Sequence, residues 1–187
     1  MSIWAISGPL LSSRSPRLPL SERVITAARR GGFSSAGSRG EREDKSGPLI
    51  AQMLTAAGYV VEETMILPDE AKALKAQLIR MADGRQVNLV LTTGGTGFSP
   101  RDITPEATCA VADRNAPGIA EAMRYHSLSI TPRGMLSRGV SVLRGKTLIV
   151  NLPGSPKAVQ ENLEYILPSL EHGVRIAAGL DGECARK

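Results

Sequence analysis

Residues 92–105 read Thr-Thr-Gly-Gly-Thr-Gly-Phe-Ser-Pro-Arg-Asp-Ile-Thr-Pro and directly follow an apolar run at residues 87–91. The run is typical of a buried parallel strand. Thr104 as N-cap, Pro105 at the first helical position and Glu106 in the first turn predict a helix start. The glycines let the backbone turn tightly and let a ligand approach its N–H groups. Because open α/β sheets bind ligands at the carboxyl ends of their strands, we expect an anion site here.

The loop matches neither standard phosphate-binding motif. A P-loop requires Gly-Lys-Ser/Thr after four intervening residues, and no lysine lies between Lys75 and Lys146. A dinucleotide fingerprint requires a glycine where Pro100 stands. Taken in isolation, an ordinary strand-to-helix turn is the alternative interpretation.

Apolar periodicity along the rest of the chain predicts alternating helices and strands. Asp44 or Ser46 is expected to cap the first helix, which Gly58 ends. Further helices are predicted to start near residues 70, 104, 117 and 156, and strands are predicted at residues 59–67, 87–91, 135–143 and 147–152, with a hairpin turn at 144–146. This alternation predicts an α/β fold: a three-layer α/β/α sandwich with a mostly parallel sheet.

Charge and composition exclude several classes of function. The net charge is +5, but residues 1–40 carry six arginines and one acid, whereas residues 41–187 carry 17 basic and 17 acidic side chains. With one Trp, three Tyr and two Phe, the chain has few side chains for base stacking. No apolar run is long enough to span a bilayer. We therefore expect no nucleic-acid or membrane partner and a cytoplasmic protein.

The cysteines and histidines show no metal-ligand spacing. Cys109 is predicted to be a small buried helix residue, and Cys184 lies far from it. His126 and His172 are interpreted as helix-end or interface residues. We therefore expect neither a disulfide framework nor a zinc site.

The two ends of the chain differ from its middle in composition. Residues 1–40 are rich in Ser, Arg, Gly and Pro, which predicts a flexible extension, with an organellar transit peptide as the alternative. Residues 41–178 are predicted to form the α/β domain and residues 179–187 a frayed tail.

Residues 92–108 closely resemble the signature of the molybdopterin-binding domain in the MogA/MoaB family of molybdopterin adenylyltransferases, which act in molybdenum cofactor biosynthesis. Three further segments, residues 40–48, 135–139 and 145–157, are similar to the same family in the same order. The resemblance runs from about Ser38 to about His172. Family members usually begin with a strand ending in Ser-Asp; the candidates here, residues 2–7 and 23–27, lack that ending. One hypothesis is a mistranslated or rearranged N-terminus.

The resemblance implies an activity: Mg²⁺-dependent transfer of AMP from ATP to molybdopterin, with release of pyrophosphate. It also implies a homotrimer and a partner for molybdenum insertion. An ionised phosphate nucleophile needs no general base, so the lack of a catalytic histidine does not count against this activity. A non-catalytic molybdopterin-binding or scaffold protein is the alternative. An unrelated nucleotide-binding α/β domain fits the loop but not the other three segments.

The resemblance also implies the site residues. Asp69 and Asp102 match the catalytic carboxylates and the magnesium ligands, although each also fits a structural role as a helix or turn cap. The residues implied in binding substrate are Thr93, Gly94, Gly95, Thr96, Gly97, Ser99, Arg101, Ser137, Arg138, Asn151, Pro153, Gly154, Ser155 and Lys157. A helix start bearing Ser155 and Lys157 suits a phosphate, with a plain cap and a solvated lysine as the alternative. Arg101 and Arg42 are weaker candidates, for phosphate, pterin or a subunit interface.

Overall fold

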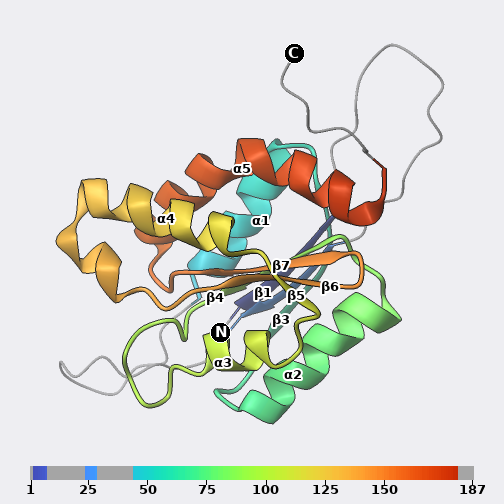
Figure 1. Cartoon of the computed structure of the whole chain (residues 1–187), viewed down its shortest axis with the longest axis horizontal. Helices are drawn as coiled ribbons and strands as arrows, with labels where there is room; N and C mark the ends of the chain where they lie inside the picture. The colour runs from blue at the N-terminus through green and yellow to red at the C-terminus, as the bar shows by residue number, and fades with distance from the viewer. Residues whose placement is uncertain (1, 8–23, 29–43, 181–187) are drawn as a thin grey trace.

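The computed structural model describes residues 2–7, 24–28 and 44–180, and side chains from residue 44 onward. Across these ranges the strands form one mixed sheet of seven strands, with helices on both of its faces (Figure 1). One face is covered by α1 (Ser46–Ala56), α4 (Pro117–Ile130) and α5 (Pro156–Ala178), and the other by α2 (Ala71–Ile79) and α3 (Thr104–Cys109). The predicted three-layer α/β/α sandwich is confirmed.

The centre of the sheet is the parallel pair β4 (Leu89–Thr93) and β7 (Thr147–Leu152), in register from Leu89↔Leu148 to Thr93↔Leu152. Every residue of both strands is buried, as expected for parallel strands covered by helices on both faces. β6 (Ser141–Arg144) pairs with β7 in antiparallel fashion through the predicted hairpin turn, and β5 (Arg114–Asn115) pairs with β6.

The other half of the sheet includes strands from the N-terminal segment. β2 (Val24–Ala28) runs parallel to β3 (Val60–Ile66) and meets β4 in parallel at Val24↔Leu89. β1 (Ser2–Ser7) pairs with β4 in antiparallel fashion. Both strand candidates of the N-terminal segment therefore form strands. The rest of residues 1–40, and the tail beyond residue 180, lie outside the described residues, so their predicted flexibility stays a prediction.

α1 has Lys45 at its N-cap, so neither predicted residue, Asp44 or Ser46, occupies that position, but Asp44 still supplies bonds to the helix start. One carboxylate oxygen of Asp44, Oδ1, accepts the N–H groups of Ser46 at 3.1 Å and Gly47 at 3.0 Å, which satisfies two helix donors that lack an intrahelical partner. Ile50 and Leu54, four positions apart in an apolar stripe along the helix, are completely buried. The stripe therefore seats the helix on the sheet.

Two predictions of local structure were wrong. The β run predicted from residue 135 starts only at Ser141, because Met135 and Leu136 lie in a 3₁₀ turn, η2 (Pro132–Leu136). Cys109 is exposed, since α3 ends there. α2 ends at Ile79 and is followed by a π-helical turn, η1 (Arg80–Gly84), in which Met81 is completely buried.

His126 and Tyr165 join two helices of one layer. Their rings, from α4 and α5, stack with centroids 4.3 Å apart and planes 4° from parallel. His126 therefore contributes to helix packing. No helix in the described part of the chain is both long and apolar enough to cross a membrane.

Candidate functional site

The glycine-rich loop leaves the carboxyl end of β4 and leads into α3. Gly94 and Gly95 have φ angles of 86° and 67°, which side chains rarely tolerate. The loop touches the second strand-to-helix junction, because a Cβ on Gly154 would lie 3.3 Å from the Cα of Gly94. The two glycine-containing junctions that the sequence singles out therefore meet at one edge of the sheet.

Thr104 does not cap α3 but hydrogen-bonds to the backbone of the glycine-rich loop. Ile103 occupies the N-cap, so the predicted cap was wrong by one residue. The Thr104 hydroxyl donates to the Gly94 carbonyl at 3.0 Å, and the Thr104 N–H donates to the Gly95 carbonyl at 3.1 Å. The residue thus fixes the loop's first turn against the helix.

Adding a single methyl group at Gly95 is expected to disrupt this turn. In Gly95→Ala the Cβ would fall 2.3 Å from the Thr104 hydroxyl oxygen, at a φ of +67°. The φ angle alone costs about 1–2 kcal/mol. We expect the unfolding temperature to fall by at least about 3 °C. Gly118→Ala is the control, since a Cβ there meets nothing within 4 Å. Equal unfolding temperatures for the two variants would contradict the described turn.

Arg138 fastens the outer part of the loop. Its backbone N–H donates to the Thr96 carbonyl at 2.9 Å, its Nε to the Gly97 carbonyl at 2.7 Å and its Nη2 to the Asp102 carbonyl at 2.5 Å. Its Nη1 pairs with the Glu106 carboxylate. The resemblance implied a substrate contact for Arg138, but the structure places its guanidinium on the loop and on α3.

The pKa of Glu106 is consistent with an ion pair to Arg138. Partial burial acts to raise the pKa of Glu106, but hydrogen bonds from its own backbone N–H and from Arg138 outweigh it, so the pKa lies below its ordinary value. Glu106 also lies in the first turn of α3, where the helix dipole favours a negative charge. The carboxylate therefore remains ionised as a partner for Arg138.

Asp102 closes the loop tip. Its Oδ2 accepts the Ser99 N–H at 3.0 Å, while its own N–H donates to the Ser99 carbonyl at 2.8 Å. A Cβ on Gly97 would lie 3.0 Å from Oδ2, so the carboxylate rests against the glycine backbone. Ser99 and Arg101 are exposed at this tip.

Asp69 follows the carboxyl end of β3, at the same edge of the sheet as the loop, because β3 is parallel to β2 and β2 to β4. It is half-buried. Glu70, not Asp69, occupies the N-cap position of α2. In the described ranges no group of three or more His, Cys, Asp or Glu side chains is placed to hold a metal. Two carboxylates with phosphate oxygens and water still form a suitable donor set for Mg²⁺.

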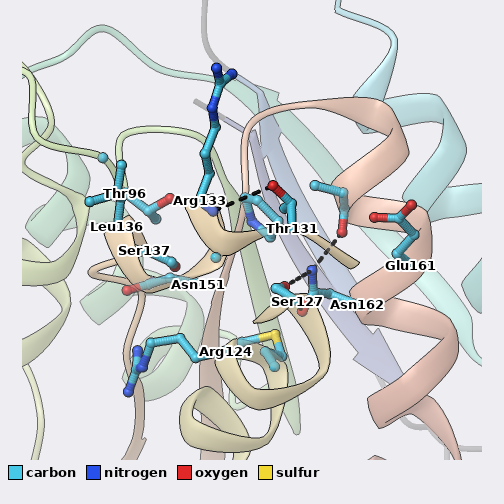
Figure 2. Close-up of a pocket in the computed structure, with 15 residues that line it drawn as sticks. Thr96, Arg124, Ser127, Thr131, Arg133, Leu136, Ser137, Asn151, Glu161 and Asn162 are labelled. Carbon is cyan, nitrogen blue, oxygen red and sulfur yellow. Dashed lines mark hydrogen bonds between the residues drawn. The ribbon is translucent and has the colours of Figure 1, made fainter. Parts of the chain in front are cut away.

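A pocket of about 270 Å³ opens beside the loop (Figure 2). It lies between Thr96 and Gly97 of the loop, the inner face of α4, η2, and the start of α5. Five residues implied by the resemblance line it: Thr96, Gly97, Ser137, Asn151 and Pro153. The sequence did not single out the remaining ones: Met123, Arg124, Ser127, Thr131, Arg133, Gly134, Leu136, Ala158, Glu161 and Asn162.

Most polar groups of the pocket wall already have protein partners. The Ser127 hydroxyl and the Asn162 amide hydrogen-bond at 3.1 Å, and the same amide donates to the Ala158 carbonyl at 2.8 Å. Arg124 donates through Nη1 to the Gly139 carbonyl at 2.7 Å. These bonds fix the shape of the wall. A small polar residue on the buried side of a helix, such as Asn162 at 3% exposed, is the signal that sequence reading overlooked.

Asn151 anchors the floor of the pocket beneath the loop. Its Nδ2 donates to the hydroxyl oxygens of Thr92 at 2.9 Å and Thr108 at 3.0 Å, and its Oδ1 accepts the Val140 N–H at 3.2 Å. The residue is 1% exposed. Its amide thus ties β4, α3 and β7 together at the point where the loop begins.

Removing the Asn151 amide is expected to destabilise the fold. Asn151→Ala leaves buried polar groups at Thr92, Thr108 and Val140 without this partner, at a cost of about 1–3 kcal/mol in the free energy of unfolding. Urea unfolding measures this loss. Asn115→Ala, on the exposed edge strand β5, is the matched control and is expected to change the free energy by less than about 0.5 kcal/mol. A loss no larger than the control's would show that the network contributes nothing.

The second junction follows β7. The Thr93 hydroxyl donates to the Pro153 carbonyl at 2.5 Å, which joins the two junctions. Ser155 is the N-cap of α5, as predicted, and accepts the Ala158 N–H at 3.3 Å. Lys157 is exposed, with 85% of its side-chain surface accessible. Arg42 lies outside the described residues.

Fold and site together define an α/β protein with a glycine-rich loop at the carboxyl edge of its sheet and a pocket beside it. A family described as "Probable molybdopterin binding domain" matches residues 20–172. The chain belongs to this family. The match begins upstream of Ser38, where the resemblance starts in the sequence, and includes β2.

Two relatives illustrate the similarity. The molybdopterin adenylyltransferase of Escherichia coli K12 is 46% identical over 136 residues, which cover 72% of this chain and 70% of the relative. The molybdopterin adenylyltransferase of Helicobacter pylori J99 is 41% identical over 150 residues, covering 78% and 84%.

Solved structures show the same likeness. The molybdopterin biosynthesis enzyme MoaB of Thermus thermophilus aligns with a TM-score of 0.70 and 46% identity, covering 74% of this chain and 87% of that one. The Mog protein of Mycobacterium ulcerans aligns with a TM-score of 0.68 and 42% identity, covering 73% and 88%. The family membership predicted from the sequence is confirmed.

Proposed function

We propose that this chain is a molybdopterin adenylyltransferase of molybdenum cofactor biosynthesis, which transfers AMP from ATP to the phosphate of molybdopterin and releases pyrophosphate. The observation that carries the proposal is the juxtaposition of the glycine-rich loop and a pocket that it helps to line. Relatives that are 41% to 46% identical bear the name of this activity.

The loop is the proposed site of the ATP phosphates. Gly95 and Gly97 carry no Cβ to obstruct a ligand, whereas the Gly94 N–H already donates to the Leu152 carbonyl at 3.4 Å. Phosphoryl transfer depends mainly on fixed dipoles and charges that stabilise negative charge, which backbone N–H groups of such a loop can supply. Ser99 and Arg101, exposed at the loop tip, lie where they can contact the same phosphates. The loop thus supplies preorganised stabilisation of the transferred group.

Asp102 and Asp69 are the proposed ligands of Mg²⁺. Both are acids at the carboxyl edge of the sheet, and Mg²⁺ in nucleotide sites takes one or two carboxylates together with phosphate oxygens and water. When bound, the ion would neutralise phosphate charge. Asp102 is held in place by its bonds to Ser99 and by the clamp that Arg138 makes on its carbonyl.

The pocket is the proposed site of molybdopterin, with the substrate's phosphate toward the loop. Thr96, Gly97 and Ser137 line the loop side, and Asn151 and Pro153 line the floor. At the adjoining junction, Gly154, Ser155 and Lys157 form a helix start suited to an anion. The shared wall at Thr96 and Gly97 brings the nucleophilic phosphate next to the nucleotide.

The apolar surface around α4 is the proposed subunit interface of a homotrimer. Exposed large side chains gather on the last turns of α4 and on η2: Tyr125, Leu128, Ile130, Met135 and Leu136. Contiguous exposed apolar residues mark interaction sites in soluble proteins. The oligomer and a partner for molybdenum insertion are expectations from the family resemblance, and a cytoplasmic location is an expectation from composition.

The direct test is a reaction of the purified chain with molybdopterin, ATP and Mg²⁺. We expect pyrophosphate release that depends on molybdopterin, and formation of adenylylated molybdopterin. Tight molybdopterin binding without any product would instead identify a non-catalytic binding protein. Absence of both binding and product would overturn the assignment to this pathway step.

A further inference from the structure

Glu161 is the one acidic residue among those that line the pocket in the described part of the chain. It lies in the second turn of α5, with 27% of its side-chain surface exposed. Its carboxylate is 3.8 Å from the ammonium group of Lys157, whose side chain is 85% exposed. Such an exposed pair contributes little, so Lys157 does not account for a carboxylate in the pocket wall.

The neighbouring polar groups do not account for Glu161 either. Ser127 and Asn162 bond to each other, and Arg124 donates to a backbone carbonyl. An ionised carboxylate accepts through two oxygens, about four lone-pair sites in all. Glu161 is therefore an acidic group of the wall whose acceptor capacity these contacts leave for a ligand.

The negative charge of Glu161 indicates which part of the ligand it contacts. Molybdopterin carries a phosphate and a dithiolene, both negative, and a carboxylate in the wall of its pocket is unfavourable unless the ligand brings donors to it. The pterin ring has one edge with two parallel donors, N3–H and the 2-amino group. A carboxylate matches two parallel N–H donors as it does the fork of an arginine.

The positions of the loop and of α5 around the pocket determine the orientation of the bound ligand. Thr96 of the loop and Glu161 of α5 lie on opposite sides of the pocket (Figure 2). A molecule whose phosphate lies at the loop extends its ring toward α5. The donor edge of the pterin then faces the carboxylate.

We infer that Glu161 accepts the N3–H and 2-amino groups of the pterin and is the residue by which the site selects a pterin over other pteridines. This inference rests on the proposed function. Ser127 and Asn162 act beside it by holding the wall in shape. Lys157 is dispensable for this role.

The test uses two probes that differ at this edge. 6-Hydroxymethylpterin carries the 2-amino group, whereas 6-hydroxymethyllumazine carries a carbonyl oxygen there, which a carboxylate repels. As competitors of molybdopterin binding to the full chain, they are expected to differ by about 10- to 100-fold in favour of the pterin. In Glu161→Gln the difference is expected to fall below about threefold, because the amide can both donate and accept.

Kinetics supply a second readout. Glu161→Gln is expected to raise the KM for molybdopterin about 10- to 100-fold, with the KM for ATP unchanged, and Glu161→Asp is expected to recover part of the loss. Glu164→Gln, exposed on the same helix, is the control and should match the wild type in every measurement. Wild-type discrimination and KM in Glu161→Gln would overturn this inference and leave the proposed function standing. Failure of the wild-type chain to bind molybdopterin at all would overturn both.

Discussion

Asp102→Asn is expected to lower adenylyl transfer at least about 100-fold while molybdopterin still binds. The amide keeps the size of the side chain and can still accept the Ser99 N–H, so the loop tip keeps its shape. What is lost is the negative charge proposed to hold Mg²⁺ against the phosphates. Pyrophosphate release measures turnover, and quenching of pterin fluorescence measures binding.

The matched control for Asp102→Asn is Asp83→Asn. Asp83 is an exposed acid whose partner, Arg144, lies at the hairpin, so its loss should leave turnover within about twofold. Unchanged turnover in Asp102→Asn would remove this carboxylate from the reaction. Parallel loss of molybdopterin binding would show that it acts on the pterin substrate instead.

Arg138→Gln is expected to lower kcat roughly 10- to 100-fold, because displacements of about 1 Å in a catalytic site have effects of this size. The substitution removes the bonds to the Gly97 and Asp102 carbonyls and to Glu106, and so releases the loop on both sides of its tip. A lysine cannot bridge three acceptors, so Arg138→Lys should be nearly as impaired. Added guanidinium should restore part of the activity of Arg138→Ala.

Arg144→Gln separates this effect from a general loss of stability. Arg144 also joins separate parts of the chain, through Asp83 and the Val111 carbonyl, but it does so at the β6–β7 hairpin. We expect Arg144→Gln to lower the unfolding temperature without lowering kcat. If both arginine variants reduce kcat only in proportion to lost stability, Arg138 has no positioning role.

The sequence was most informative where local chemistry determines the backbone. Gly94 and Gly95 require positive φ, Ser155 and Pro156 specify a helix start, and the buried run before Thr92 specifies a central strand. Each of these depends on neighbours only a few residues apart. For the same reason, both strand-to-helix junctions could be predicted without knowledge of the fold.

What could not be predicted depends on contacts between distant residues. The resemblance implies that Arg138 contacts substrate, and only the fold shows that its guanidinium also donates to carbonyls 36 and 41 positions earlier in the chain. The pocket wall from α4 and α5 carries no motif, since Ser127 and Asn162 meet only through helix packing. The local sequence predicts Thr104 as a helix cap. Its bond to the Gly94 carbonyl could not be predicted, because that bond depends on the tertiary path of the loop.

In the N-terminal region, too, local features could be predicted and tertiary contacts could not. Strand candidates were recognisable from their apolar residues, but their place in the sheet was not. β2 lies parallel to β3, and the family match begins at residue 20, ahead of this strand. β2 therefore supplies a strand within the matched range that runs parallel to β3 and lacks a Ser-Asp ending.

The central claim is that this chain moves AMP, and one labelling measurement tests it most directly. The purified chain, molybdopterin and Mg²⁺ are mixed in single turnover with ATP labelled at either the α- or the γ-phosphorus. We predict that the α label appears in the pterin product and that the γ label leaves as pyrophosphate. Label in the pterin from γ-labelled ATP, or α label recovered only as free AMP, would contradict adenylyl transfer.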